Sequence, residues 1–417
     1  IMRSIYSDVV SLCREIERDL YTINVDGQSY IVNKVAWITK YACPKCGTLV
    51  NPKYHLRKKT KILVCPRCKK KFLPHQAESY FDEVFEIHAK RKNEMILIRN
   101  KNICKTWELS ETSINVSDWY PDGKFEYPNG VRFVQHPRII EKISELFYKR
   151  GLAAASKLYN FIEKIWSENL NQGDLLKLAF IASISAATKM LPYSRTSGPS
   201  WKIHRYWIPH IRYERNFCDS FLRKLNTLTH FKKQLKAFVR NYRFFTSYDS
   251  SDINLDTSKK MIYVFRADAR GLNLQTKFDV IIIDPPHFDE INYFELTYMW
   301  QLWLKGRFND TRFSDFEFWK KEIMVNRKIG KGLSEYVQEI KNIFIKYSSM
   351  LSSGGSLFLI LHHKDNGILN EIFNQLQGCT SNLSVIQNEL SVPSSMKGIL
   401  KKKKQYVYFI TTRNLNA

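Results

Sequence analysis

Residues 278–288 read Phe-Asp-Val-Ile-Ile-Ile-Asp-Pro-Pro-His-Phe, and this stretch decides the fold that the sequence predicts. A run of β-branched residues that ends at a carboxylate and two prolines is typical of a buried strand in a parallel sheet. In open α/β sheets, ligands bind just beyond the carboxyl ends of the strands. We therefore expect Asp284 and the turn after it to lie at a functional edge of the sheet.

The turn after this strand is rich in acceptors for an amine. Pro285 and Pro286 fix the backbone dihedral angle φ and lack amide donors. A carboxylate beside a bare carbonyl can accept both hydrogens of an exocyclic NH2 group and orient its nitrogen for methyl transfer. The ring of His287 or Phe288 can stack on the base that carries the amine. The alternative is an ordinary strand end at which Asp284 caps the turn.

The residues around this strand alternate between strand and helix patterns. Strands are predicted at 261–266, 278–283, 356–361, 383–390 and 406–411, and helices at 293–305 and 336–351. Such alternation is typical of an α/β domain, which we place at residues 258–417.

The first 257 residues predict three further regions. Region 1–27 holds a helix over 3–20, region 28–135 holds a strand over 28–42 followed by cysteines and then loops and short strands, and region 136–257 is helical over 137–190 and 214–243. The last of these regions is the candidate for target recognition.

Four cysteines form two close pairs with metal-ligand spacing. Cys43 and Cys46 are separated by two residues, as are Cys65 and Cys68, and 18 residues lie between the pairs. This spacing is typical of a tetrahedral zinc site, and four thiolates leave no position for water, so we expect a structural Zn2+. Gly47 suits the positive φ that such a knuckle requires. The alternative is four free buried cysteines.

The charge of the chain indicates a polyanionic partner. Lys and Arg total 65 against 40 for Asp and Glu, a formal net charge of +25. Basic residues are dense around the cysteines, where they contact phosphates or form a solvated face. No apolar run approaches the roughly 20 residues that span a bilayer, and no secretory signal is visible, so we expect no membrane association and a cytoplasmic, nucleoid-associated location in a prokaryote.

Three segments together resemble the zinc-ribbon-containing adenine-specific DNA methylases. The central segment runs from Asp284 through Glu295 and Leu296 to Trp303-Leu304-Lys305, and it is similar to the DPPY-type motif of that family. Residues 198–209 are similar to the loop before that motif, and residues 354–365 to the segment of the fifth strand. The likeness covers residues 5–411. The family commonly has Tyr where this chain has His287.

The resemblance implies an S-adenosyl-L-methionine-dependent DNA N6-adenine methyltransferase with a Rossmann-like class I sheet in the order 3-2-1-4-5-7-6. The strands predicted above correspond to strands 3, 4, 5, 6 and 7, while strands 1 and 2 and the glycine-rich FxGxG turn are missing. We therefore expect a split enzyme, in which a smaller subunit supplies these parts and the helix over 3–20 follows its second strand. A chain cut short is the alternative. Cofactor contacts are expected from Asp268, Ala269 and Asp284.

The target base must leave the duplex to reach Asp284, so we expect double-stranded DNA to be bound with base flipping. The stretch near residue 200 interleaves cations and rings, which suits phosphate clamping and stacking: Arg195, Trp201, Lys202, His204, Arg205 and Tyr206. A packing segment is the alternative there. His362, His363 and Lys364 follow the fifth strand and either line the base pocket or have a structural role.

The leading hypothesis is the catalytic subunit of a modification, restriction or phage-defence system. Transfer to cytosine N4 or to an RNA base amine keeps the same chemistry on another substrate. A non-catalytic DNA-recognition subunit that retains the fold is the hypothesis from a different class.

Overall fold

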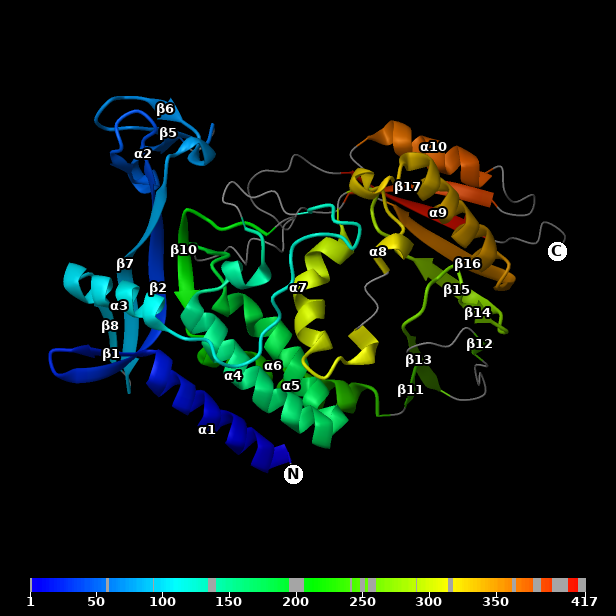
Figure 1. Cartoon of the computed structure of the whole chain (residues 1–417). Helices are drawn as coiled ribbons and strands as arrows, with labels where there is room; N and C mark the ends of the chain where they lie inside the picture. The colour runs from blue at the N-terminus through cyan, green and yellow to red at the C-terminus, as the bar shows by residue number, and fades with distance from the viewer. Residues whose placement is uncertain are drawn as a thin grey trace. The chain divides into compact units, whose positions relative to one another are not determined.

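The protein is mixed α/β and divides into two compact units in the computed structural model (Figure 1). Unit 1 comprises residues 1–235 and 295–314, and unit 2 comprises residues 236–294 and 315–417. The structure describes residues 2–57, 60–92, 94–133, 140–194, 206–240, 242–247, 252–253, 260–289, 291–313, 318–361, 365–377, 384–391 and 404–411.

Unit 1 is built on an antiparallel sheet with the strand order β8-β7-β2-β10-β9. These strands are β2 (Gln28–Ala42), β7 (Tyr80–Arg91), β8 (Glu94–Ile98), β9 (Leu191–Pro192) and β10 (Ile211–Arg215), and β1 (Thr22–Val25) and β3 (Leu49–Val50) also pair with β2. The predicted strand over 28–42 is confirmed. The prediction of loops and short strands over 76–135 is wrong, because β7 is long and α3 (Lys101–Ser113) follows β8. Charged residues within β7 interrupt its apolar alternation and hide the strand.

Helices pack beside this sheet in unit 1. They are α1 (Met2–Leu20), α4 (Lys149–Glu168), α5 (Leu170–Ser183), α6 (Phe217–Phe238) and α7 (Tyr293–Lys305), the last two crossing the unit boundary. α1 buries Val9, Cys13 and Ile16 and contacts α4. It therefore belongs to unit 1. Segment 139–148 holds only a short 3-10 turn among its described residues.

The cysteine module, residues 43–77, stands at one end of β2 and β7 (Figure 1). Its parts are α2 (Pro52–His55), β4 (Leu56–Arg57), β5 (Ile62–Val64) and β6 (Lys71–Phe72), and the three strands form a small sheet in this order. Val50, Leu63 and Phe72 are buried with the cysteines and Tyr41. This core is too small to account for a fold by itself, so the module depends on its cysteine cluster.

Unit 2 contains a four-stranded sheet in the order β15-β16-β18-β17. β15 (Phe278–Ile283) is parallel to β16 (Leu351–Leu361), while β18 (Lys404–Thr411) runs antiparallel to β16 and to β17 (Ser384–Ser391). α9 (Leu333–Ser348) and α10 (Asn366–Gln377) pack on this sheet, and their apolar residues share a core with Ile281, Leu357 and Leu359. α8 is Phe318–Lys321. The four strands predicted for this sheet are present, and the helices predicted over 293–305 and 336–351 correspond to α7 and α9.

β15 is an edge strand of this sheet among the described residues, since only β16 pairs with it. Val280 and Ile282 are 56% and 67% exposed, whereas Ile281 between them is 8% exposed and faces the core. An exposed apolar strand at a sheet edge is a template for pairing with another chain. In the described part of the chain, no strand pairs with the outer edge of β15, and the face that carries Val280 and Ile282 is exposed.

Two short parallel pairs of strands complete unit 2: β11 (Arg243–Ser247) with β13 (Met261–Phe265), and β12 (Asp252–Ile253) with β14 (Asn273–Leu274). With strands 1 and 2 missing, the sequence predicts no neighbour in this chain for the strand over 261–266; this is wrong, because β11 pairs with all five residues of β13. The helix predicted over 214–243 ends at Phe238, and β11 begins at Arg243.

No helix in the described part of the chain combines the length and the apolar character needed to cross a bilayer.

Candidate functional site

The turn after β15 presents the Asp284 carboxylate at the carboxyl end of the strand. The Asp284 side chain is 66% exposed, and Pro285 and Pro286 are half-buried. The next residues return into the core: Phe288 is 9% exposed and adopts a positive φ of 46°. A non-glycine residue with positive φ is uncommon and costs backbone energy, so tertiary contacts must hold this turn.

Two contacts hold the turn against neighbouring segments of unit 2. The Tyr336 hydroxyl on α9 donates to the Pro286 carbonyl at 2.9 Å, and its ring meets the Phe288 ring edge-on, with centroids 5.8 Å apart. Burial raises the pKa of Tyr336 to about 12, so its hydroxyl stays protonated and remains a donor. The Val325 amide donates to the Phe288 carbonyl at 3.0 Å. The turn is therefore anchored on its core side.

The open side of the turn combines an acid, an imidazole and a carbonyl. The Asp284 carboxylate lies 3.8 Å from Nε2 of His287, whose side chain is 23% exposed. No described residue donates a hydrogen bond to the Pro285 carbonyl. Asp284 and Pro285, which are adjacent in the sequence, therefore each carry an acceptor at this turn. Phe288 is a core residue in this arrangement, so of the two predicted stacking rings His287 is the one near the surface.

Asp268 and Ala269, the other predicted cofactor contacts, are engaged within unit 2. Arg270 donates to both carboxylate oxygens of Asp268, at 3.0 and 2.9 Å, and this pairing lowers the pKa of Asp268. The Ala269 carbonyl accepts the Tyr347 hydroxyl at 3.0 Å. Asp268 therefore stays ionised, but its strongest acceptor directions are already taken by an arginine.

The four cysteines of the module meet at one point. Their sulfur atoms all lie within 4.8 Å of one another, and the Cys43–Cys68 and Cys46–Cys65 distances are 3.6 Å. A tetrahedron with metal–sulfur bonds of about 2.3 Å has edges of about 3.8 Å. The cluster therefore has the geometry to bind a metal ion, as the cysteine spacing predicts.

Both knuckles of the cluster share one backbone design. The amide of Gly47 donates to the Cys43 carbonyl at 2.9 Å, and the amide of Lys69 donates to the Cys65 carbonyl at 3.0 Å. The predicted positive φ of Gly47 is confirmed at 67°, and Lys69 adopts 59° in the second knuckle. A lysine tolerates this conformation less well than glycine. The repeated turn thus reflects the demand of the ligand geometry.

Most of the predicted nucleic-acid contacts, Arg195, Trp201, Lys202, His204 and Arg205, lie outside the described residues, as do His362, His363 and Lys364. Tyr206 is described and is only 3% exposed. Its hydroxyl donates to the Leu296 carbonyl at 3.1 Å and accepts from the Met299 amide at 3.2 Å. These bonds make Tyr206 a packing residue at α7, not a surface that touches nucleic acid.

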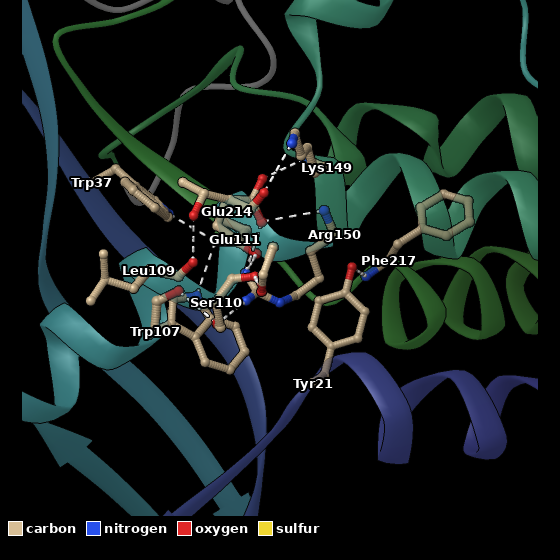
Figure 2. Close-up of polar contacts among 12 residues, drawn as sticks. Tyr21, Trp37, Trp107, Leu109, Ser110, Glu111, Lys149, Arg150, Glu214 and Phe217 are labelled. Carbon is tan, nitrogen blue, oxygen red and sulfur yellow. Dashed lines mark hydrogen bonds and ion pairs between the residues drawn. The ribbon is translucent and has the colours of Figure 1, made fainter. Parts of the chain in front are cut away.

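A buried ion cluster in unit 1 has no counterpart in the sequence predictions (Figure 2). Nη1 of Arg150 lies 3.0 Å from Oε2 of Glu111 and 2.9 Å from Oε1 of Glu214. Trp37 and Trp107 donate their indole N–H groups to Glu214 at 2.8 and 3.3 Å. These residues come from α3, α4, β2 and β10, so the cluster ties four elements together. Nothing in the local sequence pattern marks it.

Burial governs the charge state of this cluster. Desolvation, with the nearby Glu214 carboxylate adding to it, raises the pKa of Glu111 to about 7. Arg150 is 2% exposed and also stacks on the Trp107 ring at 3.8 Å. The Arg150 guanidinium therefore pairs with two carboxylates in the interior of unit 1. We interpret the cluster as a structural feature that stabilises this unit.

Comparison of the chain with protein families, with curated proteins and with solved structures returned no match.

Proposed function

We propose that this chain is the base-binding subunit of an S-adenosylmethionine-dependent DNA amino-methyltransferase, with adenine N6 as its target. The observation that carries the proposal is the turn after β15, where the exposed Asp284 carboxylate and the Pro285 carbonyl offer adjacent acceptors. Such a pair matches the two hydrogens of an exocyclic amine. The turn lies at the carboxyl end of a parallel strand, which is where α/β proteins bind ligands.

The chemistry of the turn is orientation and electrostatic stabilisation. Two accepted hydrogen bonds hold the amine nitrogen with its lone pair facing outward, and the nearby carboxylate stabilises the positive charge that develops on nitrogen. The amine can lose its proton after transfer, so Asp284 need not be a strong base. The Tyr336 contact to Pro286 keeps the acceptors in place.

The sheet of unit 2 supports the proposal. Its order β15-β16-β18-β17, in which β18 runs opposite to the other three strands, matches the order 4-5-7-6 that the resemblance predicts for one half of the sheet. Proteins with unrelated activities share such arrangements, so the turn chemistry carries more weight than the strand order.

The residues of this chain do not by themselves fit S-adenosylmethionine. Asp268 is paired with Arg270, the Ala269 carbonyl is bonded to Tyr347, and the sequence has no FxGxG turn. We therefore assign the cofactor pocket to a second, smaller polypeptide. The free edge of β15, with Val280 and Ile282 exposed, is a suitable surface for a strand from that partner.

Zinc is the metal that four thiolates at this spacing favour, and a closed four-thiolate site is structural. The net charge of +25 suits a duplex DNA partner.

The test is transfer of tritium from labelled S-adenosylmethionine, using the protein purified from its native host with any co-purifying subunit. Duplex DNA should be labelled, and Asp284→Ala should reduce the rate by about 100-fold or more. Asp289→Ala is the matched control, an exposed carboxylate in the same turn, and should retain the rate. If only RNA were labelled, the substrate would be an RNA base and not adenine in DNA. Unchanged methylation by Asp284→Ala would show that this chain is a non-catalytic recognition subunit.

A further inference from the structure

A pocket of about 1000 Å³ lies in unit 1 between the cysteine module and the end of the large sheet. Its lining comes from β2, from the cysteine module, from residues 78–80 at the start of β7, and from β10 and the residues before it: Tyr41, Pro52, Leu56, Lys61, Leu73, Pro74, His75, Ala77, Glu78, Ser79, Tyr80, Trp207, Ile208, His210 and Ile211. The volume suits a ligand of nucleotide size or larger.

The pocket has an apolar floor and an aromatic rim. Tyr41 and Ile208 on the floor are 3% and 5% exposed, and the Tyr41 hydroxyl lies 2.5 Å from Nδ1 of His210. Tyr80 and Trp207 at the rim are 49% and 44% exposed. Large rings that stay half in solvent beside an apolar floor are typical of surfaces on which a planar ligand stacks.

The positive charge of the cysteine module favours a planar ligand that carries negative charge. Residues 43–77 contain ten lysines and arginines and no aspartate or glutamate. Lys61 brings this charge to the rim, and Glu78 is the one carboxylate of the lining. Stacking rings beside a strongly basic surface are the combination that binds a nucleic acid strand, with phosphates on the cations and bases on the rings.

We propose that this pocket holds an unpaired base of a nucleic acid strand whose phosphates run over the cysteine module. Tyr80 and Trp207 stack on the base, and Lys61 contacts the adjacent phosphate. No residue of the Asp284 turn lines the pocket, so the proposal adds a second base-binding site and does not depend on methyl transfer.

The test compares binding of fluorescein-labelled oligonucleotides by the full chain. The probes are a 20-nucleotide DNA strand, an RNA strand of the same sequence, the DNA duplex, and a DNA strand with several central abasic sites. The variant is Tyr80→Ala with Trp207→Ala. The matched control is Tyr54→Ala, which removes a 72% exposed ring of the same module outside the pocket lining. Trp207→Phe retains a ring and serves as a rescue.

The double variant should bind the intact single strand about 5-fold to 150-fold more weakly, since stacking contributes on the order of 1–3 kcal/mol per base. It should bind the abasic strand as the unchanged protein does, because phosphates alone remain there. Tyr54→Ala should have little effect, and Trp207→Phe should restore most of the affinity. Comparison of the RNA and DNA strands identifies the source of the base.

Equal losses on intact and abasic strands would overturn the proposal, as would a double variant that binds like the unchanged protein. The proposal would also be overturned if the pocket bound a polypeptide and none of the nucleic acid probes. Unchanged circular dichroism and metal content must accompany the variant, and both rings are half exposed, so their removal should leave the fold intact. The binding assay contains no S-adenosylmethionine and the double variant leaves the Asp284 turn unchanged, so failure here and failure of the methyltransferase proposal remain distinguishable.

Discussion

Replacing Arg150 with Met should lower the free energy of unfolding by about 3–5 kcal/mol, which is the cost of removing one partner from a buried ion pair. Arg150 is 2% exposed and donates to Glu111, Glu214 and Ser110 at 3.0, 2.9 and 2.7 Å. Methionine fills much of the same volume beside Trp107. The loss therefore comes mainly from two carboxylates left without a cation in the interior.

The cost of Arg150→Met should depend on pH. Without the guanidinium, the pKa of Glu111, which burial already raises, rises further, so the variant folds with a bound proton that its unfolded chain releases. Its stability relative to the unchanged protein should therefore fall as the pH rises from 5 to 8. At pH 5 protonation relieves part of the repulsion between Glu111 and Glu214, so Arg150→Met should lose less stability there than at pH 8.

A control lies on the same helix. Lys157 is two turns further along α4, and its ion pair with Glu15 at 2.6 Å has side chains 37% and 44% exposed. Such exposed pairs contribute about 0–1 kcal/mol, so Lys157→Met should change little. Urea unfolding followed by tryptophan fluorescence measures both variants, since Trp37 and Trp107 contact the cluster. The reasoning would be refuted if the two substitutions had equal effects. It would also be refuted if Arg150→Met lowered the free energy of unfolding by less than about 1 kcal/mol at every pH.

Three further predictions concern single groups. Burial raises the pKa of Glu111 to about 7, so its stabilising contribution is complete below pH 4.5 and is lost as the pH rises toward 7. Glu111→Gln should therefore flatten the dependence of the free energy of unfolding on pH over that range. An unchanged slope of free energy against pH would contradict this. Tyr336→Phe should lower the free energy of unfolding by about 1 kcal/mol, the net worth of one hydrogen bond, in the same urea assay, and no loss would mean that the Pro286 carbonyl finds another donor. A strong chelator should release a single zinc ion per chain, measured by mass spectrometry, and expose residues 43–77 to protease, while Cys104→Ser, which changes a cysteine outside the cluster, should leave metal content unaltered.

Several elements were predictable because their patterns are local. The apolar run before Asp284 predicted β15, and the amphipathic spacing of 336–351 predicted α9 to within a few residues. β7 was missed because its charged residues break the alternation that marks a strand. β11 was missed for a different reason: a short apolar segment after a helix fits either structure, and only its pairing with β13 decides. The role of Tyr206 was predicted from composition, which does not tell a buried ring from an exposed one.

The sequence alone determined the cysteine cluster, since two residues between cysteines place both sulfur atoms on one side of a tight turn, whatever surrounds it. It also determined the acceptor-rich turn after β15, because prolines constrain the backbone locally. Only the tertiary structure decided the Arg150 cluster and the pocket beside the cysteine module. Each of these depends on which distant segments lie side by side, and hence on burial, which no short stretch of sequence encodes.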